Sequence, residues 1–387
     1  MNPQENKNTQ IQNSSEAPVG ADNTAKYERI PLWCKIVLAL CAVCLVIYIV
    51  TYISTPFADF FNTHIASVFR LVFATVTSIL PFSLAEAMIV LSPVILVLVA
   101  RYFAKNRCKS LKQTAVSLVC ILSIASLFFS SFVLTFSSGY RGYTLDQKLE
   151  IKREKLSAEE LYEGAMYIVE EINNISPNIS FGEDGFSQMP YEFAEMNDKL
   201  ISAYDSFSQN HSFINSFSSR LKPVVFSEAM SYAHITGVYT FFTGESNLNV
   251  NFPDYTIPFT AAHELAHQRG IAREDEANMI AFLVLLESDD EYIRYCAYVN
   301  MYEYLVNALS RADRALAKEV ILSLDESVYE EQRAYSKFFR KYAKSVTSQV
   351  SGAVNDAYLK GQGTEGEKSY GMVVDLTIAY LKEHGLI

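Results

Sequence analysis

The residues best suited to chemistry stand in the segment HELAH, at positions 263–267. His263 and His267 are four residues apart, so a helix would place both imidazoles on one face. Two imidazoles at this spacing can bind one zinc ion, while Glu264 between them can reach a water molecule at the metal. The alternative is an ordinary solvated helix that happens to carry two histidines. Three alanines around the motif would let the helix lie close under a cleft, which favours the metal site.

A catalytic zinc ion usually takes three protein ligands and leaves a fourth position for water. The other four histidines lie in segments without a related motif, and His234 is best interpreted as a core or substrate-side residue. Acidic residues follow HELAH at Glu274, Asp275 and Glu276. Glu274 and Asn278 would share one face of the next helix, so Glu274 could bind the metal while Asn278 holds a ligand histidine by a hydrogen bond. Glu276 is the alternative ligand, because it points about 200° away from Glu274 on a helix and both cannot serve. Otherwise these acids form a solvated first turn.

The composition separates an apolar first third from a more polar remainder. Hydrophobic residues make up 50% of the 387 residues and are crowded near the N-terminus, which predicts a membrane anchor followed by a soluble domain. The net charge of −11 gives no electrostatic support to a nucleic-acid partner. Cys296 is the one cysteine of the soluble part, so no disulfide framework and no cysteine zinc site is available there.

The anchor is predicted to occupy residues 29–137, after a disordered cytoplasmic tail over residues 1–28. Segments at about 30–54, 84–103 and 114–136 are long and apolar enough to cross about 30 Å of hydrocarbon. The segment 60–80 is apolar but carries His64 and Arg70, so we expect it to lie along the interface or to re-enter the bilayer without crossing it. Three crossings are therefore expected, with the lipid bilayer as a partner.

The positive charges predict the orientation of the anchor. Lys26, Arg29 and Lys35 flank the first span, and five more basic residues fill the loop between the second and third spans. Cytoplasmic loops are enriched in Lys and Arg, so both regions should be cytoplasmic. Three crossings then place residues 138–387 outside the cytoplasmic membrane of a multi-pass protein.

Residues 138–387 read as a mainly α-helical domain with a little strand. The segment 235–250 is β-branched and aromatic and turns at Thr243–Gly244, which predicts a short hairpin. Phe241–Asn249 could supply an edge strand that binds an extended peptide. Helices are expected at about 146–174, 189–207, 211–220, 275–288, 290–310, 312–323, 327–348 and 369–384, besides the HELAH helix.

The segment HELAHQRGIAREDEAN resembles the signature of a bacterial family of membrane-anchored zincin-like proteins, catalogued as a domain of unknown function. PFSLAE, GVYTFFTGESNLNV and VNDAYLKGQGTEGEKSYGMVVDLTIAY also look like blocks of that family. More distantly, the chain is similar to the gluzincin metallopeptidases, in which HExxH supplies two ligands and the base and a downstream ExxxD supplies the third ligand. The resemblance implies a mainly α-helical, zincin-like domain of the α+β class with a small β-sheet.

Carried over to this sequence, the resemblance makes His263 and His267 zinc ligands, Glu264 the general base and Glu274 the glutamate ligand. Asn278 stands where gluzincins often have aspartate, and it keeps the role of orienting a ligand histidine. The metzincin pattern HExxHxxGxxH matches only in part. Its third histidine is replaced here by arginine, whose guanidinium cannot bind zinc.

We therefore expect a zinc metallopeptidase that hydrolyses peptide or amide bonds of a peptide or protein substrate, with Glu264 as the base. An oxyanion partner is also needed, and the tyrosines offer several candidates without a choice among them: Tyr239, Tyr295, Tyr298, Tyr302 and Tyr370. One alternative is a non-catalytic zincin-fold scaffold or interaction protein of the cell envelope, which would not need Glu264. Another is a membrane signalling or transport component, which the few charges within the spans disfavour.

Overall fold

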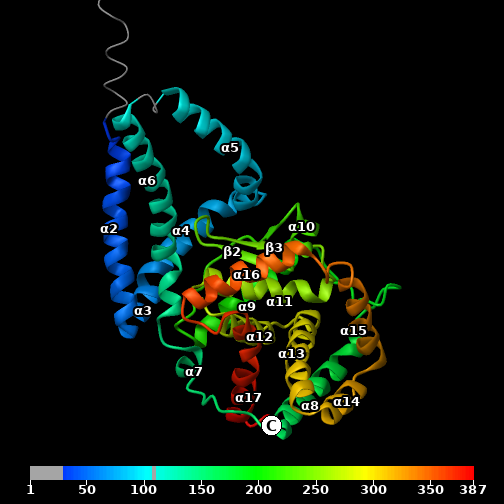
Figure 1. Ribbon diagram of the computed structural model, residues 1–387. Helices are drawn as coiled ribbons and strands as arrows, with labels where there is room; N and C mark the ends of the chain where they lie inside the picture. The colour runs from blue at the N-terminus through cyan, green and yellow to red at the C-terminus, as the bar shows by residue number, and fades with distance from the viewer. Residues whose placement is uncertain (1–28, 107–109) are drawn as a thin grey trace, which may run out of the picture.

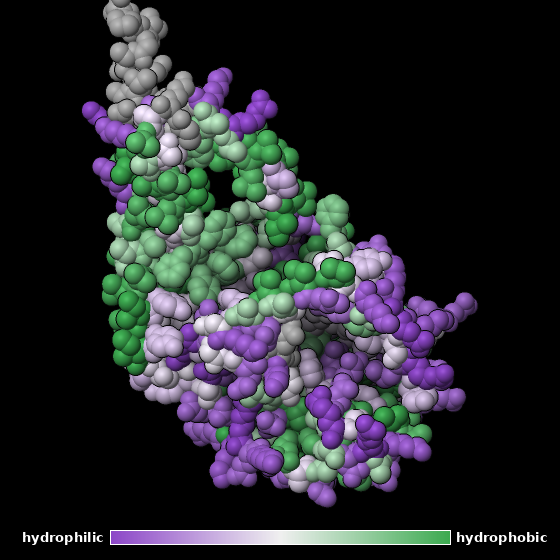
Figure 2. Space-filling model, in the orientation of Figure 1, coloured by the Kyte–Doolittle hydropathy of each residue, from purple (hydrophilic) through white to green (hydrophobic). Residues whose placement is uncertain are grey.

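The computed structural model describes residues 29–106 and 110–387, and apolar helices precede a mostly helical domain in it (Figure 1). The predicted disordered tail, residues 1–28, lies outside the described residues. Hydrophobic residues gather over the N-terminal helices, and hydrophilic residues dominate the visible surface of the helical domain (Figure 2). The division into an apolar and a polar part therefore follows the composition of the sequence.

Four helical stretches of the described chain are long and apolar enough to cross a membrane. They are Leu32–Ile53, Thr55–Ser78, Leu84–Lys105 and Leu111–Thr135. The second of them coincides with the segment assigned to the interface, and it consists of α3 (Thr55–Phe60), a π-helical turn (Phe61–Ala66) and α4 (Ser67–Ser78). Three crossings therefore remain a prediction, and four helices meet the criteria of length and composition.

Helices α2 (Leu32–Ile53) and α6 (Leu111–Thr135) lie side by side and run in parallel (Figure 1). The Sγ atoms of Cys34 and Cys120 are 3.6 Å apart, and ten residues further along each helix the Cys44 thiol lies 3.9 Å from the carbonyl oxygen of Ser130. Helix α5 (Leu84–Asn106) lies between these two helices in the sequence and runs in the opposite direction. The starts of α2 and α6 consequently share one end of the anchor.

The segment 55–78 is packed against the helical domain, and its charge is buried. Arg70 is 1% exposed, and its Nη1 donates to the Thr135 carbonyl at 2.8 Å and to Asn62 Oδ1 at 2.9 Å. The Asn62 amide donates in turn to the Gly270 carbonyl at 3.0 Å. Neutral oxygens thus solvate the guanidinium, which explains how an apolar segment carries this charge.

The beginning of α5 is also joined to the domain. The Glu245 carboxylate accepts the backbone N–H groups of Leu84 and Ala85 at 3.0 and 2.9 Å, where a helix N-terminus favours negative charge. The Glu86 carboxylate accepts the N–H groups of Val225 and Phe226 at 3.1 and 2.9 Å. A carboxylate of the domain therefore binds the backbone of α5, and a carboxylate of α5 binds the backbone of the domain.

The helical domain surrounds α11 (Ile257–Gln268) and α12 (Glu274–Leu286), whose residues are almost all buried. Around them lie α7 (Leu145–Lys148), α8 (Ala158–Ile175), α9 (Phe193–Asn210), α10 (Ser227–Tyr232), α13 (Glu291–Ala312), α14 (Arg314–Leu322), α15 (Glu326–Phe339), α16 (Val346–Gly361) and α17 (Val373–Glu383).

Three helix predictions were wrong. The predicted helix 146–174 is divided into α7 and α8, with non-helical backbone at residues 149–157. Residues 211–220, all of them described, form turns and extended backbone. There the Phe217 carbonyl accepts Arg269 Nη2 at 2.9 Å, a contact that ties this segment to the end of α11. The predicted helix 327–348 is divided into α15 and α16, with a break at residues 340–345.

A three-stranded sheet covers one side of α11. Its order is β1 (Lys222–Pro223), β3 (Glu245–Leu248), β2 (Gly237–Thr240), with β3 parallel to β1 and antiparallel to β2. The hairpin prediction is confirmed, with Gly244 at a φ of 73° in the turn. The prediction that Phe241–Asn249 forms an edge strand was wrong, because β1 pairs with the second side of β3 and leaves β2 at the edge.

Candidate metal centre

Helix α11 is held on three sides, so the interpretation of HELAH as a solvated helix is excluded. Pro258 lies in its first turn. From α9, the Tyr204 hydroxyl donates to the Ala262 carbonyl at 2.6 Å, and from β3 the Ser246 hydroxyl donates to the Glu264 carbonyl at 2.9 Å. The helix ends at Gln268, and the turn after it contains Gly270, whose φ of 95° favours glycine. This turn brings the chain back toward the histidines.

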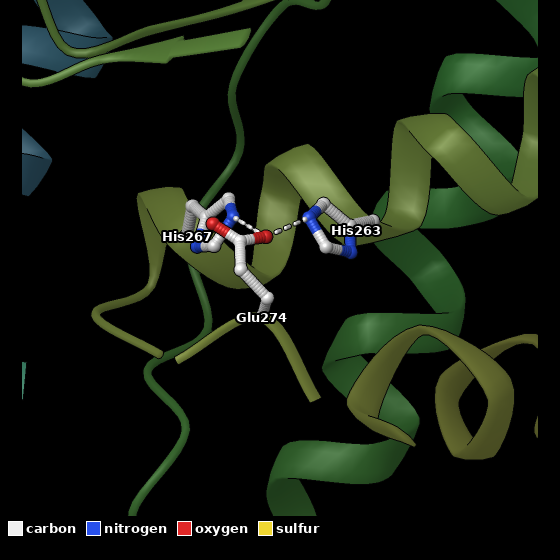
Figure 3. Close-up of side chains that lie close together, drawn as sticks. All are labelled: His263, His267 and Glu274. Atoms are coloured by element: carbon white, nitrogen blue, oxygen red, sulfur yellow. Dashed lines mark ion pairs between the residues drawn. The ribbon is translucent and has the colours of Figure 1, made fainter. Parts of the chain in front are cut away.

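The turn places Glu274, at the start of α12, against both imidazoles (Figure 3). Glu274 Oε2 lies 3.1 Å from His263 Nε2 and 3.4 Å from His267 Nε2. The three candidate ligand atoms lie within 4.8 Å of one another. In the part of the chain that the structure describes, no other group of histidines, cysteines and acids meets this criterion.

The other nitrogen of each imidazole is held by an oxygen acceptor. His267 Nδ1 lies 2.7 Å from the Ile271 carbonyl, and His263 Nδ1 lies 2.8 Å from Asn278 Oδ1. A carbonyl oxygen only accepts, so His267 must donate from Nδ1, and the same tautomer of His263 suits the amide oxygen. In the neutral rings, both Nε2 lone pairs therefore face Glu274.

This donor set fits a divalent cation. With both protons on Nδ1, the buried Glu274 Oε2 receives no hydrogen bond from the described residues. Two lone pairs and a carboxylate oxygen that converge in a buried site repel each other unless a proton or a cation lies between them. Burial alone would lower the pKa of His267, but Glu274 and Glu264 raise it to about 9, as expected where positive charge is favoured. The two imidazoles and the carboxylate could therefore hold one metal ion.

Glu264 lies beside the cluster, under the edge strand. One of its carboxylate oxygens, Oε2, is buried with no hydrogen-bond partner in residues 29–106 and 110–387. Burial raises the pKa of Glu264, and the two histidines partly oppose this shift. A Cβ added to Gly237 would lie 2.6 Å from Glu264 Oε1, so the backbone of β2 passes directly over this carboxylate. No motif in the sequence marks this role of Gly237.

The two neighbouring acids point away from the histidines. Glu276 Oε1 accepts the Leu145 N–H and Arg273 Nη1, both at 3.0 Å, and Asp275 forms an ion pair with Arg153 at 3.0 Å. The structure thus brings Glu274 to the histidine pair and directs the alternative ligand Glu276 toward residue 145. The physical reason is the helical angle between positions 274 and 276.

A cleft runs beside the cluster, and its wall differs in part from the prediction. Tyr239 lines it, but Tyr295 is buried in α13 and donates to Glu331 at 2.5 Å. Tyr298 and Tyr302 are buried on the same helix, and the Tyr370 side chain lies outside the described part. His234 lies at the cleft with Nε2 2.8 Å from the Tyr342 carbonyl. Other tyrosines of the wall are Tyr140, Tyr304, Tyr335 and Tyr358.

The fold and the site together define a mostly helical protein in which apolar N-terminal helices adjoin a buried His–His–Glu cluster. The model of the family described as "Protein of unknown function (DUF3810)" matches residues 61–378, and the chain belongs to this family. No curated protein and no solved structure matches the chain.

The hydrogen bond from His263 to Asn278 supports a first prediction. Asn278→Ala should lower the affinity for zinc about 10–100-fold, the usual effect of removing a group that orients a ligand histidine. The affinity is measured on the full chain in detergent by competition with a chromogenic chelator. Asn300→Ala is the matched control, because Asn300 also lines the cleft but donates to the Cys296 carbonyl. Equal losses in both variants would refute the role of Asn278.

Proposed function

We propose that this protein is a membrane-anchored, zinc-dependent metallopeptidase with a zincin-like domain that acts outside the cytoplasmic membrane. The observation that carries the proposal is the convergence of His263 Nε2, His267 Nε2 and a Glu274 oxygen within 4.8 Å of one another. The Oε2 oxygen of Glu264, which lies beside this cluster without a hydrogen-bond partner among the described residues, supports an enzyme rather than a scaffold, because a purely structural metal site needs no base.

His263, His267 and Glu274 would hold the zinc ion. When bound, the ion supplies a lowered pKa for a water molecule and polarises the carbonyl that the water attacks. Glu264 accepts the proton of the attacking water and then donates it to the leaving nitrogen. Burial supports the first of these steps, because a raised carboxyl pKa makes the Glu264 carboxylate a stronger base toward the proton of the attacking water.

The edge strand β2 offers a way to hold an extended peptide. Gly237, Val238 and Tyr239 line the cleft, and Val238 is exposed. One side of β2 pairs with β3, so its other side can pair with a substrate backbone. This arrangement would place the peptide along Glu264, over which β2 passes.

The orientation of the anchor supports an extracytoplasmic site. Helices α2 and α6 begin at the same end and run in parallel. The basic residues Arg101, Lys105 and Lys112 lie at this end as well, because α5 ends and α6 begins there. The positive-inside rule makes this end cytoplasmic. The helical domain adjoins the opposite ends of these helices (Figure 1).

Zinc removal tests the proposed function. The full chain in detergent, loaded with zinc, should hydrolyse members of a peptide library, and treatment with a chelator should reduce the rate at least about 100-fold, because the ion supplies several kcal/mol of transition-state stabilisation. Added zinc should restore the rate. Stoichiometric zinc with no hydrolysis of any peptide would favour the scaffold, and absence of bound metal would refute the proposal.

A further inference from the structure

Helix α16 contacts the domain-side end of α6 directly and follows a segment that packs near the start of α5. Just before it, the ring of Tyr342 packs on Tyr232 of α10, which follows the loop that Glu86 of α5 binds. At its C-terminal end, Tyr358 contacts Phe132 of α6 with ring centroids 6.4 Å apart. Figure 1 shows α16 lying across α11, on the side of the domain that bears the anchor.

Helix α16 places polar residues toward the protein and apolar residues toward the outside, the opposite of a surface helix of a soluble protein. Small and polar residues of α16 line most of its part of the cleft, among them Ser348, Ser351 and Gly352, and the exposed Val354 stands at the rim of the cleft. Valines point outward at a spacing of four residues, with Val346 77% and Val350 61% exposed. A helix at a water-exposed surface normally turns its apolar stripe inward. The outward valines of α16 therefore offer a surface that an apolar neighbour outside the chain could cover.

More exposed apolar side chains stand beside the start of α5. Val225 is 80% exposed, and Phe226 is also exposed, while Glu86 fixes their backbone at the first turn of α5. Figure 2 shows the apolar row along α16 on the half of the domain nearest the green surface of the anchor. Exposed Arg340 and Lys344 immediately precede α16, where they can meet anionic headgroups. The patch thus continues the apolar surface that the anchor already presents.

We propose that the outward face of α16, together with Val225 and Phe226, lies in the headgroup region of the bilayer that the anchor crosses. We call this surface the α16 membrane face. If it lies in the bilayer, the cleft beneath it opens next to the membrane surface. In combination with the proposed function, on which this step rests, the substrate class is a polypeptide segment next to its own lipid or transmembrane anchor. Such a segment reaches the cleft without leaving the surface.

Depth-dependent fluorescence quenching tests the position of the α16 membrane face. Trp33 is the single tryptophan, so Val350→Trp in a Trp33→Phe background reports on one site. In phosphatidylcholine–phosphatidylglycerol vesicles, lipid brominated near the headgroup should lower its fluorescence roughly two-fold or more, because interfacial helices lie about 5–10 Å into this boundary. Leu322→Trp in the same background is the control, since Leu322 is 69% exposed on α14.

Equal quenching at positions 350 and 322, or none at 350, would overturn the proposal. Fluorescence at 350 that changes with the protein-to-lipid ratio but not with bromination would instead assign the face to a second copy and would also overturn it. These readouts need neither metal nor hydrolysis, so they separate this proposal from the proposed function.

A second variant tests the substrate class. Val346→Ser with Val350→Ser should raise the KM for a lipid-anchored peptide in vesicles at least about ten-fold, as expected when apolar interfacial contacts are lost. The KM for the same peptide without lipid should stay unchanged. Equal effects on both peptides would refute delivery at the membrane surface.

Discussion

Glu264→Gln should lower the rate of peptide hydrolysis about 10²–10⁴-fold, the usual contribution of a general base, and leave the zinc content unchanged. Glutamine preserves the size of the side chain but cannot accept the proton of the attacking water. Its carbonyl oxygen can still occupy the buried space under Gly237, so the fold should survive. Initial rates on the best library peptide and metal analysis of the same sample measure the two quantities.

Glu319→Gln is the matched control for this experiment, because it makes the same chemical change on the exposed surface of α14. It should retain both hydrolysis and zinc. Wild-type rates in Glu264→Gln would remove the assigned base. Loss of zinc from that variant would show instead that Glu264 contributes to the metal site itself.

Glu274→Gln should weaken zinc binding by at least about 100-fold, more than the loss expected from any group that only orients a ligand. It replaces the oxygen that lies 3.1 and 3.4 Å from the two histidine nitrogens by a neutral amide. Glu276→Gln should retain zinc, because its carboxylate binds Leu145 and Arg273 instead. Competition with a chelator measures both affinities on folded protein, with thermal unfolding as the test of folding.

The pair of variants distinguishes the two acids directly. Loss of zinc in Glu276→Gln with retention in Glu274→Gln would reverse the assignment. Retention in both would mean that the histidines find their third ligand elsewhere, and the proposed centre would need a different oxygen.

The site could be predicted from local spacing more completely than the fold. Residues 263, 264, 267, 274 and 278 lie on two consecutive helices, so helical periodicity and one turn determine their relative positions. The β2–β3 hairpin was predictable for the same reason, because β-branched residues and Gly244 are close in sequence. Strand β1 has two residues and pairs with β3 from outside the hairpin, and no local pattern marks such a strand.

The wall of the cleft depended on contacts between distant segments. Tyr140, Tyr304 and Tyr358 reach it from the end of the anchor, from α13 and from α16, and nothing in their neighbouring residues separates them from the other tyrosines. Arg70 was interpreted as a sign of an interfacial segment, but Asn62 and the Thr135 carbonyl bury it. Long-range burial of this kind overrides what hydropathy indicates.

The Glu245 carboxylate of β3 binds the first N–H groups of α5, so the smallest unit that can fold includes the N-terminal helices. Lys222 is likewise buried and donates to the carbonyls of Thr77 and Leu80. A chain that begins after Thr135 would leave both charges, and the Gly270 carbonyl that Asn62 binds, without these partners. The N-terminal helices are therefore an integral part of the fold, and a protease that cut the helical domain free of them would expose these buried groups.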